Sequence, residues 1–235
     1  MFPTGGYDRA ITVFSPEGRI FQVEYAKQMV NQSPSAVGVE TQDGIILAGV
    51  ERRLNGLQDV SFSQKLFPLD EHIGSVVSGF SSDARILIDT AREYAQINRL
   101  IYDEPIDIAY LVKRLSLLMQ QYTQHAGLRP FGVSLIIGGV DATGPTLYQI
   151  DPSGIYIKYF ATAIGVGSSD GINFLREKYG RKLSLEEGIK LALDALKACI
   201  KDEFDISRIR MAQIKVSSKK YEELPLETIK NIYGG

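Results

Sequence analysis

A glycine pair near residue 165 is the first feature of this sequence that could bind a ligand. Gly165-Val166-Gly167 stands between a predicted strand and a predicted helix, and a glycine turn at the amino end of a helix can hold the pyrophosphate of a nucleotide. However, Asp170 stands where the dinucleotide-binding fingerprint has its third glycine, and a carboxylate there would repel phosphate. We therefore interpret the two glycines as a tight strand-to-helix turn, with nucleotide binding as the alternative.

Cysteine and histidine, which often serve as nucleophiles and metal ligands, are rare in this chain. The single cysteine, Cys199, lies in the apolar run 191–200, so we expect a buried packing residue rather than a reactive thiol. His72 and His125 have no second nitrogen or thiolate ligand near them in the sequence. We therefore predict no internal disulfide, no metal site and no cofactor.

Two phenols and a carboxylate flank a predicted turn near the amino terminus. Ser15-Pro16-Glu17-Gly18 predicts a reverse turn, because proline fixes its own φ. Tyr7 and Asp8 precede this turn and Tyr25 follows it, so their polar groups could tie an extended segment to the turn and to the next helix. The alternative is that they make the ordinary contacts of a surface turn. Residues 1–6, with uncharged side chains and two adjacent glycines, predict a flexible tail.

The elements that would position these residues come in alternating groups of strands and helices. A helix is predicted over 19–31, because Phe21, Tyr25 and Met29 recur every four residues, with Val23, Ala26 and Val30 beside them. Strands are predicted at 35–41, 45–50, 66–67, 73–78, 133–140, 146–150, 155–163, 211–216 and near 221. Helices are predicted at 83–100 with Ser81 or Ser82 as cap, at 106–124, at 170–179, from the capping box at Ser184, and at 226–232. This grouping differs from the alternation of a parallel sheet, and two stacked antiparallel sheets with outer helix layers would bury both patterns.

Composition is that of an ordinary globular protein. The 235 residues can form one domain with a single core. Hydrophobic residues are 44%, charged residues 23% and the formal net charge is -2, which gives no general attraction to nucleic acid or to an anionic membrane. No apolar run approaches the roughly 20 residues that cross a bilayer, and residues 1–6 lack the features of a secretory signal. We therefore expect one domain, residues 1–235, in the cytoplasm, with no nucleic-acid or membrane partner.

The amino-terminal residues carry a long motif. Residues 7–19, YDRAITVFSPEGR, followed by FQVEYA at residues 21–26, resemble the amino-terminal segment of proteasome α-type subunits. Further segments resemble the same family in the same order: AGVERR at 48–53, QKL at 64–66, VSG at 77–79, DAR at 83–85, QQYTQ at 120–124 and RPFGVSL at 129–135. The resemblance covers nearly the whole chain.

The resemblance implies a fold and a role. The implied fold is an α+β four-layer αββα sandwich, like that of hydrolases with an amino-terminal nucleophile, with an extra amino-terminal helix. The implied role is a non-catalytic subunit in the outer, seven-membered ring of a proteasome core particle, where it gates substrate entry. The expected partners are other α-type subunits, β-type subunits, an ATPase or other activator that docks by its carboxyl-terminal tail, and unfolded proteins that pass the pore.

The resemblance also implies a gate. In α-type subunits, one set of residues holds the amino-terminal tails upright when the axial pore opens, and the residues before them form the gate. The matching residues of this chain are Tyr7, Asp8, Arg9, Pro16 and Tyr25, and residues 1–6 would form the gate itself.

A docking pocket is implied in the same way. Lys65 matches the lysine that pairs with the terminal carboxylate of an activator, in a pocket between neighbouring ring members. Ser33 and Phe80 stand where that pocket typically has a glycine and a smaller apolar residue. From the residue type alone, a solvated lysine at the edge of a sheet is the alternative for Lys65.

A catalytic, threonine-type peptidase subunit is the alternative function. In active β-type subunits the nucleophile is a newly exposed amino-terminal residue whose free amine acts as the base. Laying Val37-Gly38-Val39 on the equivalent first strand places the nucleophile position at Pro34, which has no hydroxyl. Glu51 and Lys65 resemble the acid and the lysine that would activate a nucleophile, but they have nothing between them to activate. We therefore predict no catalytic residue in this chain.

Overall fold

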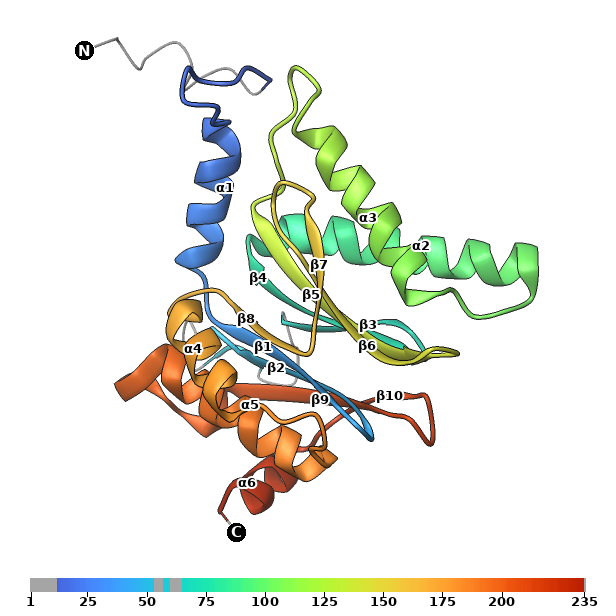
Figure 1. Cartoon of the computed structure of the whole chain (residues 1–235), viewed down its shortest axis with the longest axis vertical. Coiled ribbons are helices and arrows are strands. Elements are labelled where there is room, and N and C mark those ends of the chain that lie inside the picture. The colour runs from blue at the N-terminus through green and yellow to red at the C-terminus, as the bar shows by residue number, and fades with distance from the viewer. Residues whose placement is uncertain (1–11, 53–56, 60–64, 235) are drawn as a thin grey trace.

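The computed structural model describes residues 12–52, 57–59 and 65–234. Two antiparallel sheets lie face to face between two layers of helices (Figure 1). Helices α2 and α3 cover one sheet, and helices α4, α5 and α6 cover the other (Figure 1). The predicted four-layer αββα sandwich is confirmed.

Each sheet has five strands, and every neighbouring pair is antiparallel. The first sheet has the order β10-β9-β2-β1-β8, with β10 Tyr221–Glu223, β9 Ile209–Lys215, β2 Gly44–Val50, β1 Ala36–Thr41 and β8 Ala161–Ile164. The second has the order β3-β4-β5-β6-β7, with β3 Leu66–Asp70, β4 Ile73–Gly79, β5 Val133–Asp141, β6 Gly144–Ile150 and β7 Tyr156–Tyr159.

The helices lie where the sequence predicts them, with ends shifted by a few residues. They are α1 Phe21–Asn31, α2 Ser81–Tyr102, α3 Ile108–Tyr122, α4 Ser168–Lys178, α5 Leu185–Ile200 and α6 Leu226–Gly234, with short 3-10 turns at Lys201–Glu203 and Ile206–Arg208. The capping box of α5 is confirmed, because Glu187 N donates to Ser184 Oγ and Ser184 N donates to Glu187 Oε2. The cap predicted for α2 is wrong: Phe80 is the N-cap and makes no side-chain capping bond. The backbone of Phe80 is fixed instead by its N–H, which donates to Gly132 O at 2.8 Å.

Three apolar layers hold the sandwich together. They lie between α2, α3 and their sheet (Leu87, Leu111, Leu115, Ile137), between the two sheets (Ile45, Leu47, Ile136, Leu147), and between the other sheet and α5 (Ile46, Leu193, Leu196, Met211). All of these side chains are at most 1% exposed, and burying each contributes about 1.5 to 3 kcal/mol. The fold therefore rests on contacts far from the amino-terminal helix.

The strand predicted over 155–163 is two strands in different sheets. β7 pairs with β6 in the second sheet, whereas β8 pairs with β1 in the first. The chain changes sheets at Phe160, whose carbonyl accepts a hydrogen bond from Glu40 N at 2.7 Å. β7 is mostly exposed and β8 is mostly buried, but both are continuous β-rich sequence with only Phe160 between them, so the sequence predicted one strand.

Helix α1 stands at one end of the sandwich and buries one side only. Val23, Ala26 and Val30 are buried, whereas Tyr25 and Met29 are 50% and 42% exposed. Within the predicted stripe, Tyr25 and Met29 therefore lie on the open side of the helix and Phe21 is half-buried, whereas Val23, Ala26 and Val30 beside the stripe are the buried residues. Lys27 Nζ pairs with Asp151 Oδ2 at 2.9 Å and ties α1 to the turn between β6 and β7. None of the helices in the described part of the chain has the length and apolar character needed to cross a membrane.

Candidate docking site

Ser33, Lys65 and Phe80 lie around one cavity of about 340 Å³. Ser33 follows α1, Lys65 precedes β3 and Phe80 is the N-cap of α2. The lining is completed by Met29, Gln32, Pro34, Glu51, Arg52, Gln58, Val77, Gly79 and Ser81. The three residues predicted to form a docking pocket are thus brought together by the fold, although they lie up to 47 positions apart in the sequence (80 minus 33).

The ammonium group of Lys65 is buried. The residue is only 7% exposed, and its Nζ donates to Pro34 O at 2.8 Å and to Val77 O at 3.0 Å. Burial disfavours the charged form and lowers the pKa of Lys65 to about 8, although the nearby Glu51 carboxylate partly opposes this effect. The alternative of a solvated edge lysine is therefore wrong, because the neighbouring strands and the 33–34 segment cover the side chain.

The hydroxyl groups of two serines near position 34 donate hydrogen bonds to main-chain carbonyls. Ser33 Oγ donates to Met29 O at 2.9 Å, and Ser78 Oγ donates to Pro34 O at 2.9 Å. Lys65 therefore faces the carbonyl of a proline at the position where the catalytic alternative needs a nucleophile. Both hydroxyls donate to main-chain carbonyls rather than to Lys65, the residue that would have to activate a nucleophile in the catalytic alternative.

A second cavity, of about 290 Å³, lies on the other side of Phe80. Met29 and Phe80 line both cavities, and the second one is completed by Gln22, Tyr25, Ala26, Arg129, Pro130 and Gly132. Gly79, directly before Phe80, has φ +133, and a Cβ there would lie 2.2 Å from Gly132 O. Only glycine allows β4 to end this close to the start of β5, which places the Phe80 ring between the cavities.

An ion pair next to these cavities joins two of the family-like motifs. Arg129 Nη1 and Nη2 donate to Asp83 Oδ2 and Oδ1 at 2.5 and 2.8 Å, and Gly132 N donates to Asp83 Oδ2 at 2.8 Å. Burial raises the pKa of the Asp83 carboxyl, but the hydrogen bonds from Arg129 and Gly132 outweigh this effect, so the pKa lies below its ordinary value. Nothing in the local sequence indicated this contact between residues 46 positions apart.

Replacing Asp83 with asparagine should lower the free energy of unfolding by about 1 to 3 kcal/mol at neutral pH, because Arg129 and Gly132 lose a charged acceptor. A carboxyl with a lowered pKa in the folded state stabilises the protein above its unfolded pKa, and this contribution disappears as the pH falls through the folded pKa. The deficit of Asp83→Asn should therefore shrink in acid. Urea unfolding over a range of pH measures it, and Asp89→Asn, at an exposed position of the same helix, is the matched control. An equal deficit for both variants would contradict the assignment.

The predicted gate residues are only partly within the described residues. Tyr7, Asp8, Arg9 and the tail 1–6 lie outside them. The turn at Pro16 forms as predicted, because Gly18 N donates to Ser15 O at 2.8 Å and Gly18 has φ 75. Tyr25 lies on the open side of α1 and lines the second cavity.

The glycine turn before α4 packs against protein. A Cβ at Gly167 would lie 2.0 Å from Cys199 O, and Val166 N donates to Ser33 O at 2.8 Å. These contacts account for the glycines as a close-packed turn, which supports the predicted interpretation over the nucleotide alternative. Cys199 is 6% exposed, and burial raises the pKa of its thiol to about 11, so the prediction of a packing residue is confirmed. Asp170 pairs with Lys201 at 2.8 Å.

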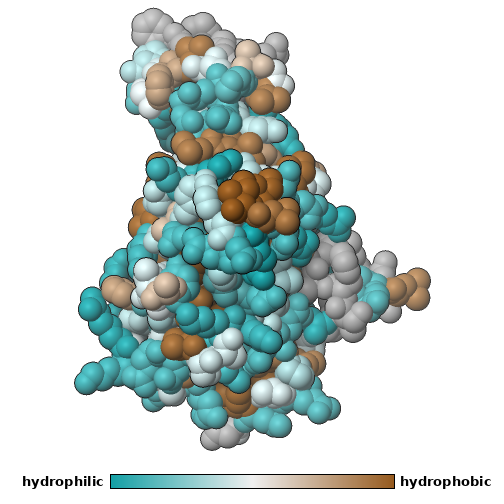
Figure 2. Space-filling model, turned by 90° about the vertical axis from the view of Figure 1, so that its right-hand side faces the viewer, coloured by the Kyte–Doolittle hydropathy of each residue, from teal (hydrophilic) through white to brown (hydrophobic). Residues whose placement is uncertain are grey.

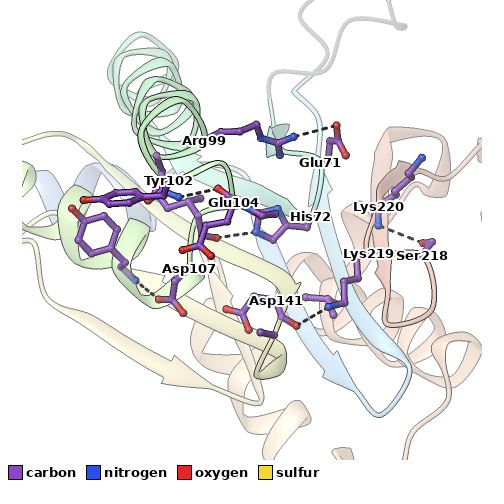
Figure 3. A pocket seen from close by; sticks show the side chains of 16 residues that line it. Glu71, His72, Arg99, Tyr102, Glu104, Asp107, Asp141, Ser218, Lys219 and Lys220 are labelled. Carbon is purple, nitrogen blue, oxygen red and sulfur yellow. Dashed lines mark hydrogen bonds and ion pairs between the residues drawn. The ribbon is translucent and has the colours of Figure 1, made fainter.

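A third cavity, of about 760 Å³, lies at the opposite end of β3 from Lys65 and was not predicted from the sequence. Figure 3 shows that polar side chains from several elements line it and that several of them bind main-chain or side-chain groups of the same cavity. Arg99 pairs with Glu71 at 3.7 Å, His72 Nε2 lies 2.9 Å from Ile106 O, and Lys219 Nζ donates to Asp141 O at 3.3 Å (Figure 3). Among the described residues, no group of histidine, cysteine and acidic side chains has the arrangement of a metal site.

This αββα sandwich with an added amino-terminal helix has the architecture expected of a subunit of the proteasome type. The family model described as Proteasome subunit matches residues 30–214, and the N-terminal signature of the proteasome A subunits matches residues 7–28. The chain belongs to the proteasome subunit family and is of the α type.

Curated relatives agree with this assignment. The chain is 45% identical over 234 residues to Proteasome subunit alpha of Pyrobaculum aerophilum, covering 99% of this chain and 96% of that protein. It is 44% identical over 228 residues to Proteasome subunit alpha of Methanothermobacter thermautotrophicus, covering 97% and 92%. It is 45% identical over 228 residues to Proteasome subunit alpha of Archaeoglobus fulgidus, again covering 97% and 92%.

Proposed function

We propose that this chain is a non-catalytic subunit of the outer, seven-membered ring of a cytoplasmic proteasome core particle. In this role it assembles with further α-type and β-type subunits, gates the entry of unfolded proteins, and docks the carboxyl-terminal tail of an ATPase or other activator. Its membership of the α-type class supports assembly with other proteasome subunits.

The observation that carries the docking role is the buried ammonium of Lys65 at an open cavity. Burying a charge costs stability, and the same desolvation lowers the pKa of Lys65. An activator tail would bring one carboxylate into the cavity and pair it with this charge, and a lysine suits such a contact because it is a compact charge with three donors. Met29, Val77 and Phe80 give the same cavity apolar walls for the side chains near the end of the tail.

The absence of a nucleophile at Pro34 supports the non-catalytic part of the proposal. Three serines surround that position, and all of them donate to main-chain carbonyls: Ser33, Ser35 and Ser78. Lys65 likewise donates to the carbonyls of Pro34 and Val77. A threonine-type peptidase would need a free amino-terminal hydroxyl residue at position 34, generated by the loss of the preceding 33 residues, which include α1.

Exposed apolar surface supports assembly. Tyr25 and Met29 on α1 form one such surface. A second lies at the carboxyl end of α2, where Ile97, Leu100, Ile101 and Tyr102 are 43%, 85%, 64% and 65% exposed. Figure 2, which looks toward that end of the molecule, shows apolar side chains gathered on an otherwise mostly hydrophilic face. Clustered apolar groups of this kind mark contact surfaces.

Native mass spectrometry of the full-length chain tests the proposal. We expect a seven-membered ring of unprocessed chains of 26.0 kDa each, without peptide hydrolysis unless β-type subunits are added. Met29→Asp should leave a folded chain with defective rings, because it places a charge on the open side of α1. Gln28→Asp, which adds the same charge at an exposed polar position of the helix, should assemble normally. A chain processed to a new amino-terminal hydroxyl residue that cleaves peptides alone would establish the catalytic alternative instead.

A further inference from the structure

The ring of Phe80 forms part of the wall of the Lys65 cavity, and Arg129 lies on the other side of that ring. We infer that Arg129 is a positioning residue for tail docking, because it holds the Phe80 ring in the orientation that shapes the Lys65 cavity. The inference rests on the proposed function. It adds a residue that does not line the Lys65 cavity and would act there only through Phe80.

The guanidinium of Arg129 is itself held in place. It makes two hydrogen bonds to Asp83, at 2.5 and 2.8 Å, and a third from Nη1 to Pro130 O at 3.0 Å. A paired contact with both oxygens of a carboxylate fixes the plane of the guanidinium as well as its position. Asp83 is only 4% exposed and also accepts from Gly132 N, so the anchor of Arg129 is a buried carboxylate that joins the start of α2 to the start of β5.

The ring of Phe80 depends on such a contact. The backbone of Phe80 is fixed at the start of α2, but its side chain lies at the surface and the residue is 45% exposed. The guanidinium carbon of Arg129 lies 5.7 Å from the centre of the ring, within the range in which a cation is attracted to an aromatic face. A ring held in this way gives the cavity one shape before the tail binds. Binding then costs less conformational entropy, because the Phe80 side chain is already ordered.

Two variants can distinguish an effect of this cation–ring contact on docking from a general loss of stability. Arg129→Met removes the cation and the pairing with Asp83 but keeps a long side chain. Phe80→Leu keeps an apolar wall but removes the aromatic face on which the cation acts. If Arg129 works through the Phe80 ring, its replacement should affect docking only when that ring is present.

The experiment is a double-mutant cycle on the full-length chain in its native assembly. The probe is a fluorescein-labelled peptide, Gly-Ser-Gly-Leu-Phe-Leu, with a free terminal carboxylate, and its amidated twin serves as control. Fluorescence anisotropy should show that Arg129→Met weakens binding about two- to fivefold in the parent chain. In the Phe80→Leu chain the same change should have no effect. Arg129→Met also leaves the Asp83 carboxylate without its partner. Arg129→Lys, which keeps a positive charge for Asp83, is therefore measured in parallel. Any change in tail binding that it causes should likewise be seen with Phe80 present and be absent in the Phe80→Leu chain.

Each outcome decides the inference. No effect of either Arg129 variant, or an equal effect in both backgrounds, would overturn it, because the arginine would then be irrelevant to docking or merely structural. Lys65→Ala separates this from the proposed function. If Lys65→Ala abolishes carboxylate-dependent binding while the Arg129 variants bind the peptide as tightly as the parent chain does, only the inference about Arg129 fails. If Lys65→Ala and amidation of the peptide change nothing, the docking role itself fails.

Discussion

Lys65→Ala is expected to weaken binding of a carboxylate-ended tail by about 10- to 150-fold, the range that corresponds to the loss of one charge-assisted hydrogen-bonded contact. The variant removes the buried cation that lines the proposed tail cavity and donates to Pro34 O and Val77 O. Activator-stimulated degradation should fall with tail affinity, whereas ring assembly should persist. Peptide anisotropy and native mass spectrometry measure the two effects separately.

Lys178→Ala is the matched control, because it removes a lysine at an exposed position of α4, away from the cavity. It should leave tail binding unchanged. If Lys65→Ala binds the tail as tightly as the parent chain does, Lys65 has a structural role only and the docking part of the proposal is wrong.

The pH dependence of stability gives an independent test of the buried ammonium. The pKa of Lys65 is about 8 in the folded chain, against an ordinary value of 10.5. Between these values the unfolded chain binds the proton more tightly, so the free energy of unfolding should rise with pH in that interval. Lys65→Met lacks this proton. The stability of Lys65→Met relative to the parent chain should therefore fall as the pH rises from about 8 toward 10.5, and an unchanged difference would show that Lys65 is not buried as a cation.

Deleting residues 1–6 is expected to open entry to the chamber without an activator. In a core particle reconstituted with active β-type subunits, hydrolysis of an unfolded protein should rise several-fold. Hydrolysis of a small peptide should rise less, because a small peptide needs a narrower opening. The fold should be unaffected, since the three apolar layers of the sandwich are formed by residues that follow α1 in the chain.

Tyr7→Phe is the companion variant, because it removes only the hydroxyl that the proposal uses to hold the raised tail. The lost hydrogen bond corresponds to roughly 0.5 to 1.5 kcal/mol, so activator-driven opening should be impaired rather than increased. A truncated particle that degrades unfolded protein no faster than the intact one would show that residues 1–6 do not gate entry.

The sequence by itself determined the local elements. The periodic apolar residues of α2 and α3 predict both helices to within a few residues of Ser81–Tyr102 and Ile108–Tyr122, because helix formation depends on side chains three and four positions apart. The same holds for Ser184 and Glu187, whose capping box spans one turn. The grouping of strands and helices argued against a parallel sheet and was compatible with stacked antiparallel sheets, whereas the four-layer arrangement itself was implied by the resemblance to proteasome subunits.

Only the tertiary structure decided which partners these elements meet. The change of sheet at Phe160 depends on hydrogen bonds to β1, which lies far earlier in the chain. The buried side of α1 depends on the strands beneath it, and the pairing of Asp83 with Arg129 spans 46 positions. Lys65 shows most directly what the sequence could not predict. Its motif predicted a charge, but its burial and its lowered pKa come from the 33–34 segment and Val77, because desolvation is set by all the atoms around a group and not by its neighbours in the sequence.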